Sequence, residues 1–380
     1  MTQEIPVKST LVSGRRIRRG VVPGVVALAI ALTGCGAAND SSDDSASSGD
    51  SGSSESLSGT LNGGGSSAQE SAQGVWRAGF QEANSGVTVN YDPVGSGTGR
   101  ENFISKAYAF AGSDSALSTD EGELDAANAR CGGDVIEVPA YVSPIAVIFN
   151  LPGVDALNLK PEVVAQIFDG KITTWNDPAI AADNPDADLP DTAITPVHRS
   201  DDSGTTGNFT DYLSQAGGGA WSYEPDGVWP IQGGEAAEGT SGVVAAVKAG
   251  EGTIGYADES QAGGLSIVAL GVGDEFNKPS AEGAAQVLAN SPRAEGRSAS
   301  DMVFEIDRTD TASGSYPLIL TSYLLACPTY DDANEAALVK GFLSYIVSEE
   351  GQQASAEQAG SAPLDSSLAE EAQSIIDGIK

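Results

Sequence analysis

Basic residues are scarce in this chain of 380 residues, because 19 Lys and Arg stand against 53 Asp and Glu, for a formal net charge of −34. Residues 1–34 hold five of the basic residues and one acidic residue, so the rest of the chain carries −38. Nucleic acids and anionic membrane surfaces are bound through clustered Lys and Arg. The composition therefore excludes both as binding partners.

Histidine and cysteine are also rare, with one histidine and three cysteines in the chain. The usual zinc sites draw most of their ligands from these two residue types, so no metal site is expected. A glycine-rich loop ending in Lys-Ser or Lys-Thr, which marks nucleotide-hydrolysing P-loops, is missing as well. We therefore expect no metal and no cofactor.

The N-terminal apolar run, residues 21–32, is too short to span a bilayer. Lys8 and four arginines precede it, so residues 1–34 are predicted to be a signal peptide. The run ends in Leu-Thr-Gly before Cys35, which resembles the bacterial lipobox. Cys35 is then expected to carry a lipid such as palmitate that holds the protein on the outer face of the cell membrane. The alternative is a chance cysteine in an ordinary signal peptide.

The residues after Cys35 are almost all Ser, Asp, Gly and Ala, and cannot bury enough apolar surface to fold. Residues 35–56 are therefore predicted to be a disordered tether. The remaining stretch of about 320 residues suits two lobes of ordinary domain size. Cys131 and Cys327 lie within it, and an oxidising exterior makes a disulfide between them plausible, with two buried free thiols as the alternative.

Strand-like runs alternate with helical patterns in this part of the chain, which indicates an α/β fold. The clearest helical stretch is 161–169. The strand-like runs are 87–91, 136–149, 194–198, 253–256 and 318–325.

The sequence contains four loops rich in Gly, Ser and Thr. Three of them lead into the start of a helix, and the fourth carries a carboxylate, Asp114, at the end of a strand. In the first, the spacing of Ser67 and Glu70 predicts that Ser67 is the N-cap of a helix. Helix starts present backbone N–H groups and about half a positive charge each, so three of them with Arg199 supply about +2.5 around an oxyanion. The loops are 61–67, 95–99, 110–117 and 197–206.

In their order and spacing, these loops resemble those of the PstS-type phosphate-binding proteins of ABC transporters. The resemblance covers about residues 58–375. The motifs that carry it are GGGSS at 63–67, GSGTG at 95–99, AGSD at 111–114, IFDGKITTWNDPAI at 167–180, RSDDSGTT at 199–206, GVVAAV at 242–247, GTIGY at 252–256 and GSYPL at 314–318.

The resemblance implies a type II periplasmic-binding-protein fold, with two α/β lobes joined by a two-segment hinge. Lobe I would comprise residues 57–142 and 312–380, and lobe II residues 143–311. The implied function is extracytoplasmic binding of inorganic phosphate between the lobes and its delivery to the permease subunits of an ABC transporter. The protein is expected to act as a monomer and not as an enzyme.

The resemblance also implies a set of phosphate-binding residues, with Asp201 orienting the guanidinium of Arg199. The sequence departs from the family pattern at Ala68, Asp202 and Gly207, and Asp202 adds a negative charge near the anion unless its side chain points outward. The implied ligand groups are Ser67, the backbone of Ala68, Ser96, Asp114, Arg199, Ser203, Gly204 and Thr205.

An ionised Asp114 would accept a hydrogen bond from the P–OH of phosphate, whereas sulfate has no proton to donate. A binder of another oxyanion, sulfate or molybdate, remains an alternative. A phosphatase or serine hydrolase using Ser203 is less favoured, because His198 precedes Arg199 on a strand and should point to the opposite face. A surface protein without a transport role is the third alternative.

Overall fold

The computed structural model describes residues 56–380. The predicted signal peptide, Cys35 and nearly all of the predicted tether lie outside the described residues. The strands are β1 Ser58–Gly65, β2 Gly86–Asp92, β3 Phe110–Ser113, β4 Ile136–Asn150, β5 Leu157–Leu159, β6 Thr195–Arg199, β7 Glu235–Ala237, β8 Thr253–Asp258, β9 Ser266–Val272, β10 Glu275–Asn277 and β11 Ile319–Ala326. The helices are α1 Glu70–Ala83, α2 Ser96–Ile104, α3 Glu123–Cys131, α4 Pro161–Phe168, α5 Pro178–Asp183, α6 Gly204–Ala216, α7 Gly239–Ala249, the 3-10 turn η1 Glu259–Gln261, α8 Ala281–Asn290, α9 Ala333–Val347, α10 Glu349–Ala359 and α11 Ser366–Ile376.

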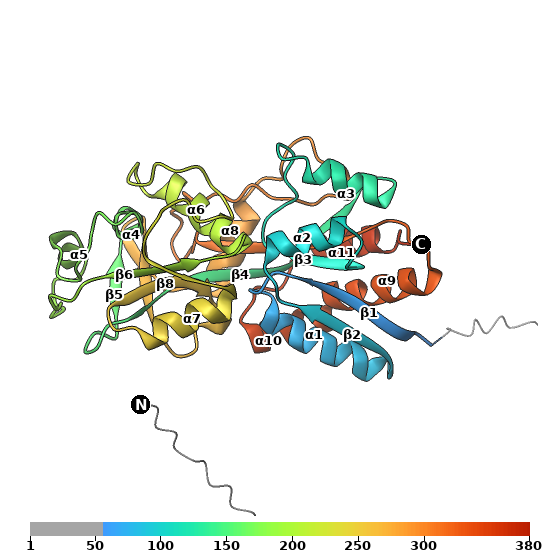
Figure 1. The fold of residues 1–380 in the computed structure, drawn as a ribbon, viewed down its shortest axis with the longest axis horizontal. Coiled ribbons are helices and arrows are strands. Elements are labelled where there is room, and N and C mark those ends of the chain that lie inside the picture. Colours follow the sequence, from blue (N-terminus) through green and yellow to red (C-terminus); the bar gives the residue numbers. More distant parts are fainter. Residues whose placement is uncertain (1–55) are drawn as a thin grey trace, which may run out of the picture. The chain divides into compact units, whose positions relative to one another are not determined.

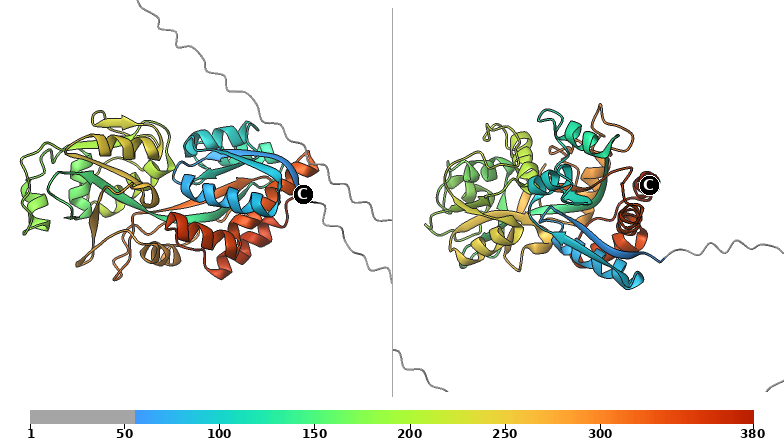
Figure 2. Two further views of the ribbon diagram at one scale, coloured as in Figure 1. Left: turned by 90° about the horizontal axis from the view of Figure 1, so that it is seen from below. Right: turned by 45° about the vertical axis from the view of Figure 1, so that its right-hand side comes forward.

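One run of paired strands, in the order β2-β1-β3-β11-β4-β8-β6-β7, passes through two α/β lobes (Figures 1 and 2). In lobe I, β1 is parallel to both β2 and β3, while β11 is antiparallel to β3 and β4. In lobe II, β6 is parallel to β7 and β8, and β8 is antiparallel to β4. The long strand β4 belongs to both lobes. The α/β prediction and the two-lobed fold are confirmed.

The strand and helix predictions from the sequence agree closely with these bounds. Each of the five strand-like runs corresponds to a strand, with ends that differ by one or two residues, and the predicted helix 161–169 is α4. All residues of β4 except the last are buried, because helices or loops cover both faces of this strand. A strand buried on both faces needs a mostly apolar run rather than alternation, and β4 has such a run, interrupted by Glu137 and Ser143.

Aromatic side chains fill the core of each lobe. In lobe I, Trp76 from α1 meets Tyr141 of β4 edge to face, with ring centroids 6.2 Å apart. In lobe II, Phe209 of α6 stacks on Tyr256 of β8 at 4.2 Å, and Phe168 of α4 packs against Phe209 at 4.8 Å. These contacts fix α1 and α6, two of the helices whose first turns face the space between the lobes.

The chain changes lobes within β4. Pro144 is still paired with Ile319 of β11, whereas Ile145 is paired with Asp258 of β8. This position agrees with a first crossing near residue 142. The segment 297–302 lies against lobe I, because the Glu137 N–H donates to Ser300 O and the Met302 N–H donates to Glu137 O. The segment 297–302 falls within the predicted lobe II, 143–311, although it contacts lobe I. The limits of the two lobes stay a prediction.

A disulfide joins Cys131 and Cys327, so this prediction is confirmed and the free-thiol alternative is wrong. It connects the last residue of α3 to the residue that follows β11, across a sequence separation of 196.

None of the helices within residues 56–380 combines the length and the apolar character that a membrane span requires.

Asp258 is a fully buried carboxyl at the crossing between the lobes. Its two carboxylate oxygens accept from Tyr141 Oη at 3.0 and 3.1 Å, and Oδ1 also accepts from Ser260 Oγ at 2.5 Å. Burial raises its pKa from 3.8 to about 7, although these hydroxyl donors act in the opposite direction. Asp258 therefore holds a proton in the folded protein over a pH range in which the unfolded chain has lost it.

Replacing both disulfide cysteines, Cys131→Ala with Cys327→Ala, should lower the free energy of unfolding by about 2 to 5 kcal/mol, because the unfolded chain loses a constraint on a long loop. Urea unfolding followed by circular dichroism measures this loss. The wild-type protein with a reductant is the control, and it should unfold at the same urea concentration as the variant. An unchanged midpoint in both would contradict the prediction.

The contribution of Asp258 to stability should be present at low pH and disappear as the pH rises from about 4 to about 7, because the folded pKa is the higher one. Between about pH 5 and pH 8 the wild type should lose about 2 to 3 kcal/mol more than Asp258→Asn, which has no proton to lose. Urea titrations of both proteins at the two pH values measure the difference. Equal losses would show that Asp258 titrates normally.

Candidate functional site

The four loops singled out in the sequence lie at the carboxyl ends of strands: three follow the neighbouring strands β2, β1 and β3, and the fourth follows β6. In lobe I, β1, β2 and β3 are parallel, so residues 66–69, Gly95 and Asp114 follow their carboxyl ends at one edge. In lobe II, β6 leads into the loop 200–203 and then into α6. The carboxyl edge of an open α/β sheet is where ligands bind in such folds. Here the carboxyl edges of both lobes meet.

The residues named from the sequence come together at this meeting point. The ligand residues with side chains have at most 3% of their surface exposed, and the supporting Asp201 has a side chain that is 15% exposed. The Asp114 N–H donates to Ser96 Oγ at 3.1 Å, and Thr205 Oγ1 of lobe II donates to Asp114 Oδ2, also at 3.1 Å. A Cβ added to Gly204 would lie 2.7 Å from Ser96 Oγ and 2.8 Å from Asp114 Cβ. The lobes are therefore closed on one another at this point.

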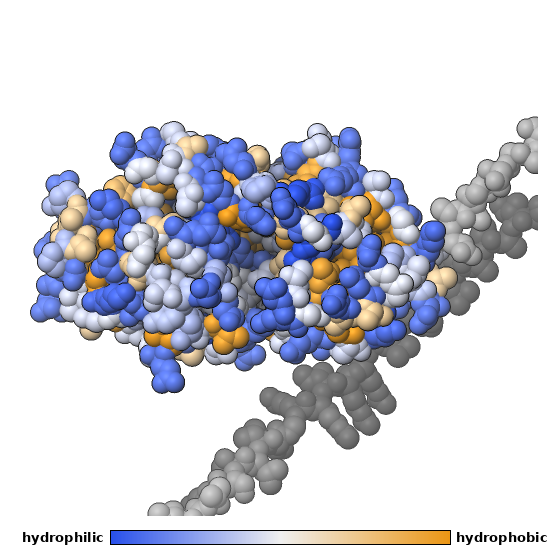
Figure 3. All heavy atoms as spheres, turned by 90° about the horizontal axis from the view of Figure 1, so that it is seen from above, coloured by the Kyte–Doolittle hydropathy of each residue, from blue (hydrophilic) through white to orange (hydrophobic). Residues whose placement is uncertain are grey.

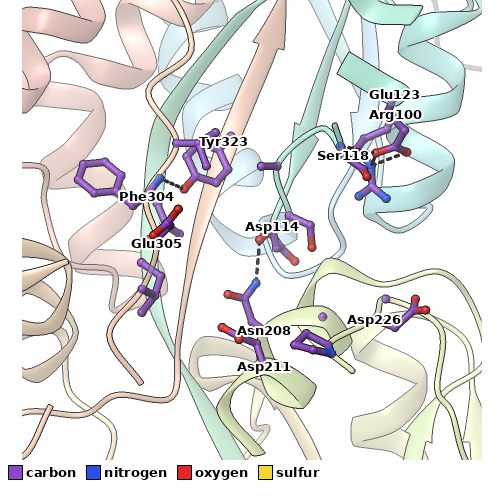
Figure 4. A pocket seen from close by; sticks show the side chains of 18 of the residues that line it. Arg100, Asp114, Ser118, Glu123, Asn208, Asp211, Asp226, Phe304, Glu305 and Tyr323 are labelled. Carbon is purple, nitrogen blue, oxygen red and sulfur yellow. Dashed lines mark hydrogen bonds and ion pairs between the residues drawn. The ribbon is translucent and has the colours of Figure 1, made fainter. Parts of the chain in front are cut away.

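Further hydrogen bonds join the lobes around the same centre. Ser67 Oγ lies 3.0 Å from Thr240 Oγ1 at the start of α7. Gln261 Nε2 donates to the carbonyl oxygens of Ser67 and Ala68, at 2.8 and 3.1 Å. Asn208 Nδ2 of α6 donates to Asp114 O at 2.7 Å, and Figure 4 shows this bond spanning the two lobes.

Asp114 is surrounded by hydroxyl donors. Oδ1 accepts from Ser322 Oγ at 2.6 Å and Oδ2 from Thr205. Burial raises the pKa of Asp114, and hydrogen bonds from Ser322, Ser66 and Thr205 and the charge of Arg199 offset only part of this rise. A carboxylate offers about four lone-pair positions, and the hydrogen bonds from Ser322 and Thr205 occupy two of them, so room remains for a further donor.

Arg199 makes a two-pronged ion pair with Asp201, which supports the predicted orienting role. Arg199 Nε donates to Asp201 Oδ1 at 2.8 Å and Nη2 donates to Asp201 Oδ2. Burial acts to raise the pKa of Asp201, but the guanidinium and the Gly239 N–H outweigh it and lower the pKa. The pairing fixes the plane of the guanidinium and offsets much of its charge.

The serine hydroxyls at the site are oriented by backbone N–H groups. Ser96 Oγ accepts from Asp114 N, and Ser203 Oγ accepts from Thr206 N at 3.2 Å as the N-cap of α6. A hydroxyl whose lone pair is used in this way still has its own proton to donate. Both serines can therefore act as donors toward a bound anion. The Ala68 N–H, in contrast, already donates to Ser66 Oγ at 3.1 Å.

The prediction that Ser67 caps α1 is wrong. The helix begins at Glu70 after Gln69, and no side chain caps it directly. Ser66 Oγ accepts from the backbone N–H groups of Ala68 and Gln69, at 3.1 and 3.3 Å, and so satisfies the donors just before the helix. Ser67 is free to turn toward lobe II and contact Thr240.

His198 has a structural role, as expected. Its ring lies on Trp229, with centroids 5.0 Å apart, and its two nitrogens contact the carbonyl oxygens of Arg199 and Gly233. Asp202, the unexpected acid before Ser203, points toward the solvent-accessible edge, where its side chain is 44% exposed and lies 3.5 Å from Arg100 of α2. It is therefore paired rather than directed at the centre of the site.

Several residues at the site were missed in the sequence. Thr240 follows a strand and a glycine at a helix start, the same signal as in the other loops, and could have been found. Asn208 lies one helical turn after Gly204 and so shares its face. Ser322 and Arg308 have no local pattern in the sequence that marks them. Ser322 reaches Asp114 through the pairing of β11 in the sheet, and Arg308 lies before β11 and contacts Asn208.

A cavity of about 660 Å³ adjoins Asp114 on one side of the cleft. Figure 4 shows Asp211, Asp226 and Arg100 around it. Asp202 and Arg308 also line this cavity. Hydrophilic residues dominate the face of the molecule with the hollow between the lobes, shown in Figure 3. Within residues 56–380, no group of three or more His, Cys, Asp or Glu side chains is arranged to hold a metal ion.

Comparisons with known proteins point to one family. Residues 50–350 match the model of the PBP superfamily domain. The chain is 34% identical over 349 residues to the phosphate-binding protein PstS2 of Mycobacterium bovis, covering 89% of this chain and 92% of the relative. It is 36% identical over 342 residues to the phosphate-binding protein PstS 3 of Mycobacterium leprae, covering 86% and 90%.

Solved structures agree in fold. The high-affinity periplasmic phosphate-binding protein PfluDING, solved with phosphate, matches with a TM-score of 0.69 at 23% identity, covering 83% of this chain and 93% of that one. A phosphate-binding protein from Stenotrophomonas maltophilia matches with a TM-score of 0.66 at 21% identity, with the same coverage. At these identities the match concerns the fold alone.

Proposed function

Because this chain belongs to the PstS family of phosphate-binding proteins, within the PBP superfamily, we propose that it binds inorganic phosphate in the cleft between its lobes and passes it to a phosphate ABC transporter. The proposed site consists of the residues named from the sequence. They are Ser67, Ala68, Ser96, Asp114, Arg199, Ser203, Gly204 and Thr205, with Asp201 in support.

The environment of Asp114 is the observation that carries this proposal. Hydrogen bonds from Ser322 and Thr205 and the charge of Arg199 offset part of the rise in pKa that burial causes, and lone-pair positions of the carboxylate remain for another donor. Phosphate near neutral pH still carries a proton, which can fill one of these positions. A sulfate oxygen has no proton, so its lone pair would face a lone pair of the Asp114 carboxylate. Leaving a buried polar group without a partner weakens binding by about 1 to 3 kcal/mol, and by more when the group is charged.

The remaining phosphate oxygens would be held by neutral donors and by Arg199. Ser96 and Ser203 have hydroxyl protons to donate, and the first turns of α2 and α6 carry N–H groups without acceptors in their own helices. Each helix start adds about half a positive charge. Because Asp201 offsets much of the charge of Arg199, these dipoles are a major part of the attraction.

Another oxyanion, sulfate or molybdate, is the second candidate ligand, and Asp114 disfavours it for the reason given above. An enzymatic use of Ser203 finds no support in the geometry. His198 has its ring nitrogens on two main-chain carbonyls and stacks on Trp229, so it does not act as a base for Ser203.

Outside the binding site, we propose that Cys35 carries the lipid anchor after removal of residues 1–34, with residues 35–56 as a tether to the outer face of the membrane. Lobe I would comprise 57–142 and 312–380 and lobe II 143–311. The permease subunits of the transporter would recognise the closed protein. A monomer suffices for this role.

Asp114→Asn should bind phosphate about a hundredfold more weakly, because the amide replaces one acceptor with a donor. The preference for phosphate over sulfate, about a thousandfold in the wild type, should fall at least tenfold. Arg199→Lys is the matched comparison and should weaken both anions, since a lysine cannot reproduce the two-pronged geometry. Calorimetric titration with each anion measures these constants, and equal affinity of the wild type for both anions would refute the proposed role of Asp114.

Gly204→Ala should weaken phosphate binding about 10- to 100-fold, because its Cβ would press on Ser96 and Asp114 when the lobes close. Gly74→Ala in α1 is the control, since a Cβ there meets nothing within 4 Å. Calorimetry gives the affinity, and small-angle X-ray scattering with and without phosphate reports closure. Wild-type affinity in Gly204→Ala would contradict the closed geometry.

A further inference from the structure

Two buried acids lie together beneath the loop that carries Asp114, outside the proposed phosphate site. Glu137 of β4 is fully buried, and Asp301 of the segment 297–302 is paired with it in a short parallel bridge. We call Glu137 and Asp301 the buried acid pair. The basic group in contact with both is Arg297, whose Nη1 lies 3.0 Å from Asp301 Oδ2 and 3.5 Å from Glu137 Oε2.

The buried acid pair and Arg297 hold both polar backbone groups of Leu117. The Leu117 N–H donates to Glu137 Oε1 at 3.1 Å, and Arg297 Nη2 donates to Leu117 O at 2.9 Å. Leu117 is three residues after Asp114. The loop 114–117 is therefore fixed at one end in the cleft and at the other on this cluster.

The charges of the cluster balance only when the pair keeps one proton. With both acids ionised, two carboxylates would face one guanidinium in a dry interior and repel each other. Asp301 Oδ1 has no protein donor among the described residues, and a proton shared with Glu137 would satisfy it. One proton therefore accounts for both the charge balance and this oxygen.

We propose that the buried acid pair, through its shared proton, positions the 114–117 loop for phosphate, so that loss of the proton in alkaline solution weakens phosphate binding. Glu137 and Asp301 are positioning residues, since neither touches the proposed ligand. The inference rests on the proposed function and adds a pH dependence to the same site.

The electrostatics of the surroundings agree with this inference. Burial, followed by the charge of Asp301, raises the pKa of Glu137 to about 8, and Arg297, the Leu117 N–H and Arg100 act against the rise. Burial also raises the pKa of Asp301. Tyr323 of β11 and Arg293 also act in this region, and burial raises the pKa of Tyr323, which stays above this range. Proton loss from the pair thus falls above neutral pH.

The test compares phosphate affinity at about pH 7 and about pH 9.5 in the wild type and in Glu137→Gln. The glutamine keeps an oxygen for the Leu117 N–H and supplies a permanent donor toward Asp301. A difference of one pKa unit between the bound and free protein corresponds to about tenfold in Kd, so wild-type affinity should fall about tenfold more than that of the variant. Phosphate's own titration is common to both proteins and cancels in the comparison.

Two further variants complete the calorimetric experiment. Asp301→Asn should also flatten the pH profile, and it carries the test if Glu137→Gln does not fold. Glu371→Gln, which removes an exposed partner of Arg293, is the control and should follow the wild type. A variant profile as steep as that of the wild type would overturn the inference while leaving phosphate binding intact. Absence of phosphate binding by the wild type at pH 7 would instead overturn the proposed function.

Discussion

The structure depends on one buried carboxylate, Asp114, which hydroxyl donors from both lobes hold inside a dry cleft. Asp114 is buried between the two lobes, and burial raises its pKa and so favours the protonated form. Hydroxyl donors from three separate segments, around Ser66, Thr205 and Ser322, oppose this effect. One of these donors belongs to lobe II, so closure of the lobes is itself part of what keeps Asp114 an acceptor.

This local arrangement also explains how an acidic protein can attract an anion. The surface field of a chain with a formal charge of −34 repels phosphate, but it is screened beyond about 8 Å at physiological salt. Within the closed cleft, helix starts and oriented hydroxyls act over hydrogen-bonding distances, where screening is weak. The acidic surface thus affects how phosphate approaches the protein, whereas the helix starts and hydroxyl groups in the cleft determine how it is held. Higher salt should weaken the long-range repulsion more than the short-range contacts.

Much of the fold could be predicted from the sequence, because the information was local. The glycine-rich turns after strands, the mostly apolar run of β4 and the helix patterns all reflect neighbours along the chain. The predicted site residues were brought together because three of the loops follow adjacent parallel strands. The prediction that Ser67 is the N-cap was wrong because of a contact with a residue far away in the sequence. Its hydroxyl contacts Thr240, 173 residues away, and Ser66 takes over the backbone donors.

The parts that could not be predicted are the long-range supports of Asp114. Arg308 donates to Asn208 Oδ1 at 2.5 Å, and Asn208 donates to the carbonyl of Asp114, which links the crossing segment to the site. No periodicity marks Arg308, since its position depends on the fold of the segment before β11.

These supports approach Asp114 from different sides. Asn208 holds its carbonyl from lobe II, Ser96 holds its N–H from lobe I, and Ser322 of β11 holds its carboxylate. The backbone and side chain of one residue are thus fixed by separate elements. A carboxylate held in this way cannot rotate to suit an anion without a proton, because each rotation would break a buried hydrogen bond at a cost of about 1 to 3 kcal/mol. The proposed selectivity would therefore depend on rigidity as much as on charge, and rigidity is a property of the whole closed fold.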